Sequence, residues 1–158
     1  MKITLSYQKD LDSLRQTQKR SKYIPNQAPD KKMIIGIGID LVEVPRIELA
    51  ISRWGSRFES RVFTEKELIY CNSKKDKAQR LACRFAAKEA MLKALGTGWR
   101  NGIDWKEIEV TNDKLGKPVI SLCGKTEEIS HQLGVKKILL SISSTENYGA
   151  AQVVLVSE

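Results

Sequence analysis

The chain has 158 residues with a formal net charge of +8, and 41% of the residues are hydrophobic while 29% are charged. This length and balance are typical of one globular domain and exclude a disordered chain. No apolar run approaches the roughly 18 residues of a membrane span, and the first residues lack the apolar segment of a secretory signal. We therefore expect no membrane partner and a cytoplasmic location.

The three cysteines, Cys71, Cys83 and Cys123, are odd in number and widely spaced, and the chain has a single histidine, His131. Neither a zinc site nor a disulfide framework fits this pattern. The cysteines are interpreted as reduced structural thiols in a compartment like the cytosol. His131 is interpreted as a surface residue.

Most of the positive charge lies near the N-terminus. Residues 1–32 contain eight basic and three acidic residues, a net charge of +5, whereas residues 33–158 carry only +3. None of the three tryptophans lies in a basic stretch of 33–158, so no nucleic-acid partner is expected. We predict a polar basic extension over 1–32 and one domain over 33–158. The extension is a solvated tail, a targeting segment for an organelle or a partner-binding arm.

Apolar patterning and capping signals predict a short series of helices and strands. In chain order they are a strand over 33–44, a helix from Pro45, a short helix from the Thr64–Glu67 capping box to Tyr70, a long helix over 79–95 closed by Gly96, strands over 106–111 and 119–122, a short helix over 126–133, and strands over 137–143 and 150–156. This order predicts the α+β class, with one small sheet packed on one long helix.

Asp40 lies inside the first predicted strand, where aspartate is disfavoured. Alternation along the strand puts Asp40 on one face with Gly36 and Gly38, and Ile37 and Ile39 on the opposite face. The glycines leave room for something large beside the carboxylate. A bend in the strand is the alternative explanation.

Glu89 and Lys93 lie one helical turn apart in the long predicted helix, in line with the small residues Ala82 and Ala86. A Glu–Lys pair on an exposed helix face is the simpler interpretation. On an apolar face, however, a carboxylate needs a strong partner because desolvation of an unpaired charge is costly. A divalent cation shared with Asp40 would be such a partner, and two carboxylates plus waters suit Mg²⁺.

Four longer strings are more specific than these short patterns. They resemble, in order, the signatures and closing strands of the holo-acyl-carrier-protein synthase family of 4′-phosphopantetheinyl transferases. The matching segments are GIGIDLVEVPRI at 36–47, RFAAKEAMLKALGTG at 84–98, IEVTND with GKP at 108–113 and 116–118, and SISST with YGAA at 141–145 and 148–151. The resemblance covers about 33–158.

The resemblance implies a Mg²⁺-dependent transfer in fatty acid biosynthesis. The 4′-phosphopantetheine arm of coenzyme A would move to a serine of apo acyl carrier protein, with release of adenosine 3′,5′-bisphosphate. By the same resemblance, Asp40 and Glu89 hold the metal and Lys93 approaches the phosphates. Glu89, or a water beside it, is the candidate base for the serine proton.

The family is known for trimers with coenzyme A bound at subunit interfaces. The residues that the resemblance assigns to coenzyme A are Arg84, Phe85, Lys88, Gly96, Thr97, Gly98, Lys117, Pro118, Ser143 and Thr145. Of these, Lys117, Pro118 and the segment 143–145 would come from the neighbouring chain. A stripe formed by Arg46, Arg53 and Arg57 on the helix after Pro45 is expected to dock the acidic carrier, with Trp54 and Phe58 on an apolar stripe that packs inward.

Two features depart from the family pattern. Ser144 stands where the family usually has histidine, and family members commonly begin near Met33. The main rival interpretation is a non-enzymatic basic protein that binds RNA or ribosomes, and the second, which Ser144 slightly favours, is a carrier-binding protein without catalysis. The intact set of Asp40, Glu89 and Lys93 argues against this second interpretation.

Overall fold

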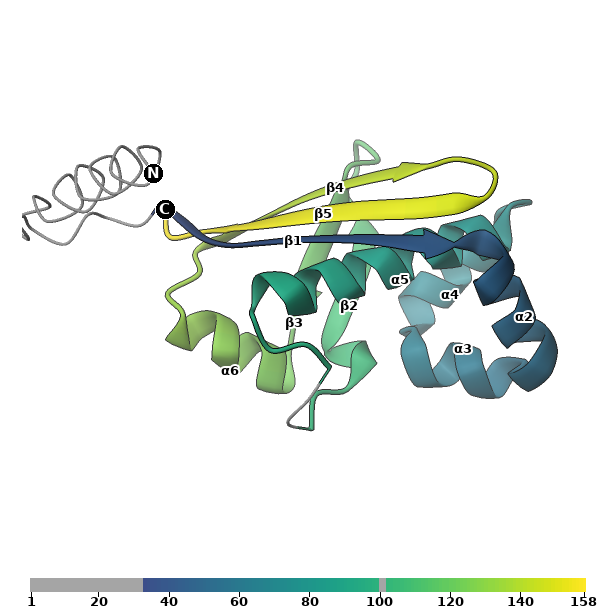
Figure 1. The fold of residues 1–158 in the computed structure, drawn as a ribbon, viewed down its shortest axis with the longest axis horizontal. Coiled ribbons are helices and arrows are strands. Elements are labelled where there is room, and N and C mark those ends of the chain that lie inside the picture. Colours follow the sequence, from purple (N-terminus) through teal and green to yellow (C-terminus); the bar gives the residue numbers. More distant parts are fainter. Residues whose placement is uncertain (1–32, 100–101) are drawn as a thin grey trace, which may run out of the picture. The chain divides into compact units, whose positions relative to one another are not determined.

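The computed structural model describes residues 33–99 and 102–158, and the predicted basic extension over 1–32 lies outside them. The described elements, in chain order, are β1 (Ile34–Glu43), α2 (Val44–Trp54), α3 (Ser56–Val62), α4 (Glu65–Asn72), α5 (Lys77–Ala94), the 3₁₀ turn η1 (Trp105–Glu107), β2 (Ile108–Asn112), β3 (Pro118–Leu122), α6 (Gly124–Gln132), β4 (Lys137–Ser144) and β5 (Tyr148–Val156). The predicted α+β class is confirmed (Figure 1).

The strands form two antiparallel sheets rather than the single sheet that was predicted. One has the order β1-β5-β4, and the other is the hairpin of β2 and β3. The hairpin strand β2 begins later than predicted because Asp104 caps η1 through the backbone N–H of Lys106, which keeps the chain helical as far as Glu107. Helix α5 packs against β1 and β5 and also contacts β2, so it links the two sheets.

Glycines let α5 approach the three-stranded sheet at backbone distance (Figure 1). A Cβ atom at Gly36 would clash with the carbonyl oxygen of Ala94, and one at Gly38 would clash with that of Ala90. The predicted alternation of β1 is therefore confirmed. The space that the glycines clear is filled by this helix, however, and not by a ligand.

Helix α2 ends at Gly55, which has a φ of 50° and separates it from α3. The prediction that Trp54 packs inward is wrong, because the indole stands at the last position of α2 and is 57% exposed. Ile47, earlier on the same helix, is buried. After α3, Thr64 and Glu67 form the predicted capping box at the start of α4.

The core lies between α5 and the inner faces of the sheets, with Met91, Leu92, Val153 and Leu155 fully buried. The opposite side of the three-stranded sheet, here called the outer face (Ile37, Ile39, Leu41 and Leu139), is apolar and exposed. In the described part of the chain, the longest helices are too polar or too short to cross a lipid bilayer.

Candidate functional site

Asp40 and Lys93 meet at the junction of β1 and α5. The ammonium of Lys93 lies 2.6 Å from Oδ1 of Asp40 and also donates a hydrogen bond to the carbonyl oxygen of Ile39 at 3.0 Å. Asp40 points toward α5 because it shares the strand face of Gly38. The close approach of helix and strand thus sets a carboxylate and an ammonium side by side.

Glu89 lies one turn before Lys93 on α5 and is partly buried. Burial raises the pKa of the Glu89 carboxyl, and the negative charge of Asp40 raises it further, while Lys93 acts in the opposite direction. Among the described residues, none forms a hydrogen bond or an ion pair with the Glu89 carboxylate. Burial and the charge of Asp40 therefore oppose the ionisation of Glu89, and Lys93 compensates for part of this effect.

The three charged side chains line a cavity of about 550 Å³, a size typical of small-molecule sites. The rest of its lining is largely apolar and comes mainly from α2, with Phe85 from α5 and Phe58 from α3. Arg46 and Arg53 also line the cavity, so cations stand beside the carboxylates. A ligand with an anionic part and an apolar part fits this lining.

The donor set at Asp40 and Glu89 fits a hard divalent cation. Two carboxylates bring hard oxygen donors. A cation would offset both the burial and the nearby negative charge of Asp40, which together raise the pKa of Glu89. In the described ranges no group of three or more His, Cys, Asp and Glu side chains gathers. The remaining ligands would therefore be waters or phosphate oxygens, which is the usual environment of Mg²⁺.

Of the residues predicted to bind coenzyme A, only Phe85 lines this cavity. Arg84 instead lies 4.2 Å from the ring centroid of Tyr70 and donates a hydrogen bond to Asn112 at 2.8 Å. Asn112 pairs with Pro118 in the hairpin, so Arg84 stands near the predicted residues of that turn. The other predicted residues lie in loops and strand ends outside the cavity lining, namely Gly96, Thr97 and Gly98 after α5, Lys117 and Pro118 in the hairpin, and Ser143 and Thr145 at the end of β4.

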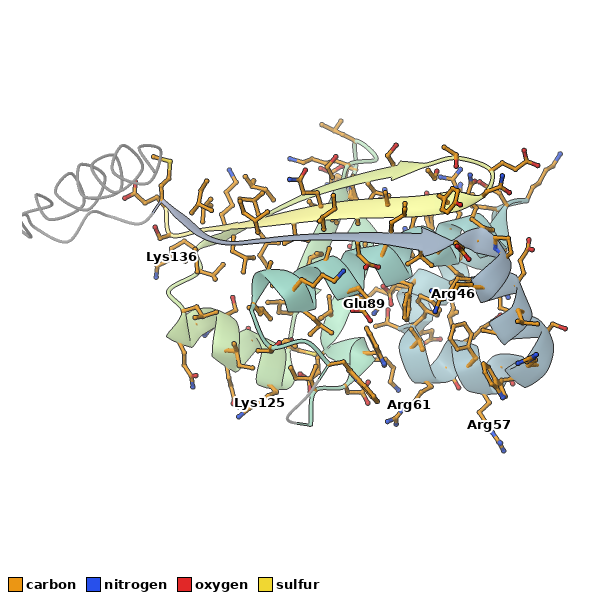
Figure 2. All side chains as sticks on the ribbon, in the orientation of Figure 1. Arg46, Arg57, Arg61, Glu89, Lys125 and Lys136 are labelled. Atoms are coloured by element: carbon orange, nitrogen blue, oxygen red, sulfur yellow. The ribbon has the colours of Figure 1, made fainter. Side chains whose placement is uncertain are left out.

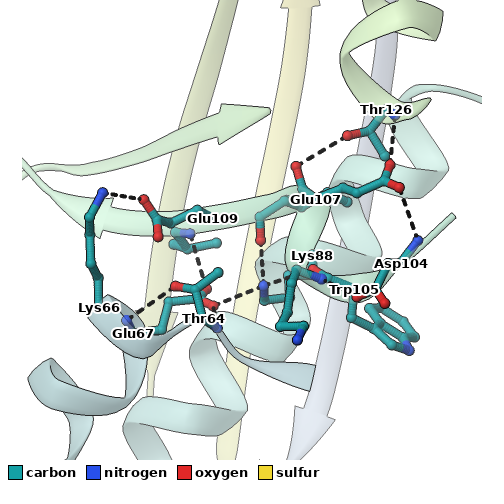
Figure 3. A network of polar contacts seen from close by, with 12 residues as sticks. Thr64, Lys66, Glu67, Lys88, Asp104, Trp105, Glu107, Glu109 and Thr126 are labelled. Carbon is teal, nitrogen blue, oxygen red and sulfur yellow. Dashed lines mark hydrogen bonds and ion pairs between the residues drawn. The ribbon is translucent and has the colours of Figure 1, made fainter. Parts of the chain in front are cut away.

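Lys88 lies in the protein interior and not on a surface that coenzyme A could contact, contrary to the prediction. Its contacts are instead with other parts of the fold. Its side chain is fully buried, and its ammonium lies 2.9 Å from Oε2 of Glu67 (Figure 3). It also donates hydrogen bonds to the carbonyl oxygens of Trp105, at 2.9 Å, and Ile108. Burial lowers the pKa of Lys88, whereas Glu67 raises it.

Three aromatic rings pack together beside this buried pair, with Phe85 on α5, Trp105 in η1 and Trp99 between these two elements. Phe85 lies 5.1 Å from Trp105, and Trp105 lies 5.8 Å from Trp99 with the two indoles only 14° from parallel. We call Phe85, Trp99 and Trp105 the aromatic wall. Of the three rings, that of Phe85 lines the cavity. Sequence reasoning missed the wall and the role of Glu67, although the capping box had already marked Glu67.

The predicted arginine stripe divides into two parts. Arg46 and Arg53 line the cavity, whereas Arg57 lines a separate groove with Trp54 and Arg61. In Figure 2, Arg57 and Arg61 project from α3, and Lys125 projects from α6 at the other end of the fold. The break at Gly55 explains the division, because it starts a new helix before Arg57.

Comparison with known proteins gives one consistent result. The model of the 4′-phosphopantetheinyl transferase superfamily matches residues 36–153. A holo-[acyl-carrier-protein] synthase from Solibacter usitatus is 48% identical over 123 residues, which cover 78% of this chain and 98% of that protein.

Solved structures agree with the sequence match. The holo-[acyl-carrier-protein] synthase of Neisseria meningitidis has a TM-score of 0.72 and 36% identity, covering 78% of this chain and 98% of its own. A holo-(acyl-carrier-protein) synthase from Bacillus anthracis, in complex with CoA (3′,5′-ADP), has a TM-score of 0.66 and 38% identity, covering 80% and 99%.

We expect the substitution Glu89→Gln to stabilise the metal-free protein at neutral pH. Because folding raises the pKa of Glu89, the folded state binds this proton more tightly than the unfolded state. At pH values above the folded-state pKa, the ionised Glu89 carboxylate therefore lowers the free energy of unfolding. At pH values below the ordinary pKa of glutamate, the group is protonated in both states and this destabilisation disappears.

Thermal unfolding in a chelating buffer checks this expectation. The melting temperature of Glu89→Gln should exceed that of the unchanged protein at pH 7, and the difference should vanish in acid. A neutral variant that melts at the same temperature at pH 7 would contradict the electrostatic description of the site.

Proposed function

The chain belongs to the 4′-phosphopantetheinyl transferase superfamily, and we propose that it acts as a holo-[acyl-carrier-protein] synthase that depends on Mg²⁺. The enzyme transfers the 4′-phosphopantetheine group of coenzyme A to a serine of apo acyl carrier protein, releasing adenosine 3′,5′-bisphosphate, in fatty acid biosynthesis. The observation that carries the proposal is the meeting of Asp40, Glu89 and Lys93 in one cavity, in a chain that matches the family over residues 36–153.

Asp40 and Glu89 would hold the Mg²⁺ ion. When bound, the ion neutralises charge on the pyrophosphate oxygens and on the leaving group. The hard oxygen donors of these two carboxylates and their mutual repulsion support this assignment. Lys93 already neutralises part of the negative charge of Asp40, and its ammonium would turn to the phosphate oxygens of coenzyme A.

The transfer itself exchanges the phosphoanhydride bond of coenzyme A for a phosphodiester bond to the carrier. The serine Oγ of the carrier bonds to the phosphorus that bears the pantetheine arm, and the bond from that phosphorus to the bridging oxygen of adenosine 3′,5′-bisphosphate breaks. The serine proton passes to the Glu89 carboxylate or to a water beside it. The place of Glu89 in the cavity lining, beside Asp40 and Lys93, supports this role.

Removal of either carboxylate should abolish the reaction without unfolding the protein. We expect Asp40→Ala and Glu89→Ala each to lower turnover by about a hundredfold or more. Lys93→Ala should lower kcat more than it weakens coenzyme A binding, because the charge that it meets develops in the transition state.

The measurement is the mass of apo acyl carrier protein after incubation with enzyme, coenzyme A and Mg²⁺. The unchanged enzyme should add one phosphopantetheinyl group. Near-normal turnover of either carboxylate variant at saturating Mg²⁺ would refute the metal assignment, and an inert unchanged enzyme would refute the proposed function.

The remaining contacts to coenzyme A are proposed to form between chains of a homotrimer. Within one chain, Lys117, Pro118, Ser143 and Thr145 do not line the cavity, which is consistent with their supply to a neighbour's site. The apolar outer face of the sheet supports such an assembly, because a broad exposed apolar surface is a typical interface.

A charge on the outer face should separate the chains. Ile39 is 65% exposed in the single chain, so Ile39→Asp should leave the fold intact while burying a carboxylate in any interface there. Light scattering should give the mass of three chains for the unchanged protein and of one chain for the variant. Leu133→Asp, at a 43% exposed position at the end of α6, is the control and should remain trimeric. A trimeric Ile39→Asp would exclude this face.

The carrier is proposed to dock along Arg46, Arg53 and Arg57. Arg46 and Arg53 flank the carboxylates in the cavity, and Arg57 continues the basic surface into the groove beside Trp54. Acidic carriers would be steered and oriented by these guanidinium groups. The exposed indole of Trp54 offers an apolar contact between them.

Charge reversal tests this surface. Arg46→Glu and Arg53→Glu should raise the KM for the carrier by about tenfold at low ionic strength, with coenzyme A affinity nearly unchanged, and moderate salt should weaken the unchanged reaction by screening. Lys125→Glu, on α6 at the far end in Figure 2, is the matched control. Unchanged carrier KM values in both arginine variants would move the docking surface elsewhere.

A cytoplasmic location is also proposed. It is supported by the three cysteines, which are all free thiols, two of them buried.

A further inference from the structure

The ion pair of Glu67 and Lys88 is fully buried and fully satisfied. An ammonium has three N–H donors, and those of Lys88 meet Glu67, the carbonyl of Trp105 and the carbonyl of Ile108. Glu67 also accepts hydrogen bonds from the backbone N–H groups of Thr64, at 2.8 Å, and Val110, at 3.0 Å. Both charges therefore lie in one network with no solvent contact (Figure 3).

This network joins four elements at one point. Lys88 belongs to α5, Glu67 to α4, Trp105 to η1 and Ile108 to β2. Because all three donors of the ammonium are used, rotation of α5 about its axis or a shift along it would break several of these bonds together. The pair therefore holds α5 in one orientation relative to η1 and β2.

The buried pair of Glu67 and Lys88 is connected both to the aromatic wall and to the Glu89 carboxylate. The carbonyl that Lys88 holds belongs to Trp105, whose ring packs on Phe85 and stacks with Trp99. Glu89 follows Lys88 directly on the same helix and faces the cavity. A displacement at Lys88 would thus move Phe85 and Glu89, both on α5, relative to Trp99 and Trp105.

Stability alone does not account for such a pair. Replacing a buried ion pair by apolar side chains of similar volume is often neutral or stabilising, because desolvation of the charges is costly. We propose that Glu67 and Lys88 are positioning residues that hold the aromatic wall and the Glu89 carboxylate in the geometry used for transfer. The kinetic part of this inference rests on the proposed function.

The test is the double variant Glu67→Gln/Lys88→Met, which removes both charges and keeps side chains of similar length. We expect it to unfold cooperatively but to lose the circular dichroism couplet of the stacked Trp99 and Trp105 indoles. Its kcat should fall by about tenfold to a hundredfold, as for a displaced reacting group, while the KM for the carrier stays unchanged. Its affinity for Mn²⁺ alone, measured by electron paramagnetic resonance, should weaken.

Lys66→Met is the matched control. Lys66 pairs with Glu109 at 3.0 Å in the same region, but its side chain is 73% exposed. This variant should keep the couplet, kcat and Mn²⁺ affinity, because an exposed ion pair contributes little to the fold.

A folded double variant with an unchanged couplet and kcat would overturn the proposal and leave the pair a purely structural role. If the double variant does not fold, Glu67→Asp decides, because it keeps the charge but draws the carboxylate back by one carbon. Partial loss of the couplet and of kcat in Glu67→Asp supports positioning, and normal values contradict it. An inert unchanged enzyme would refute the proposed function instead, and the couplet and Mn²⁺ affinity would still test the positioning.

Discussion

The close approach of α5 to β1 is the constraint on which the site depends. Gly36 and Gly38 leave no side chain between the strand and the helix backbone at Ala90 and Ala94. Asp40, two residues farther along the same strand face, is thereby brought to the helix that carries Glu89 and Lys93. A larger residue at either glycine would push the helix outward and separate the carboxylate from its partners.

Local residue patterns, such as strand alternation, helical spacing and capping motifs, were sufficient to predict most of the individual helices and strands. The alternation of β1, the long helix and the capping box at Thr64 all depend on local residue patterns, and each is present. The division into two sheets could not be read in the same way. It depends on which strands pair across the chain, and a strand pattern does not name its partner.

The candidate site shows the same limit at the level of single residues. Lys88 and Glu89 are consecutive charged residues in one motif, but one is sealed in the core and the other faces a cavity. Consecutive residues of a helix point about 100° apart around its axis, so the side chains of Lys88 and Glu89 enter different surroundings. The position of α4 decides which side of α5 faces Glu67 and which side faces the cavity. No local pattern in the sequence of α5 gives the position of α4. The exposed Trp54 was misjudged for a related reason, because the helix ends there and leaves its apolar side uncovered.

The strand order has a consequence for how the site is assembled during synthesis. Asp40 lies on β1, at the beginning of the described fold, and β1 pairs only with β5, its last element. Pairing across so many residues is slow, because a long loop must close before the strands make contact. Until β5 is in place between β1 and β4, β1 has no strand partner within the described fold and its register is undefined, so Asp40 has no fixed position. The helical residues of the site can therefore form locally and early, whereas the carboxylate from the strand joins them only when the final strand has been made.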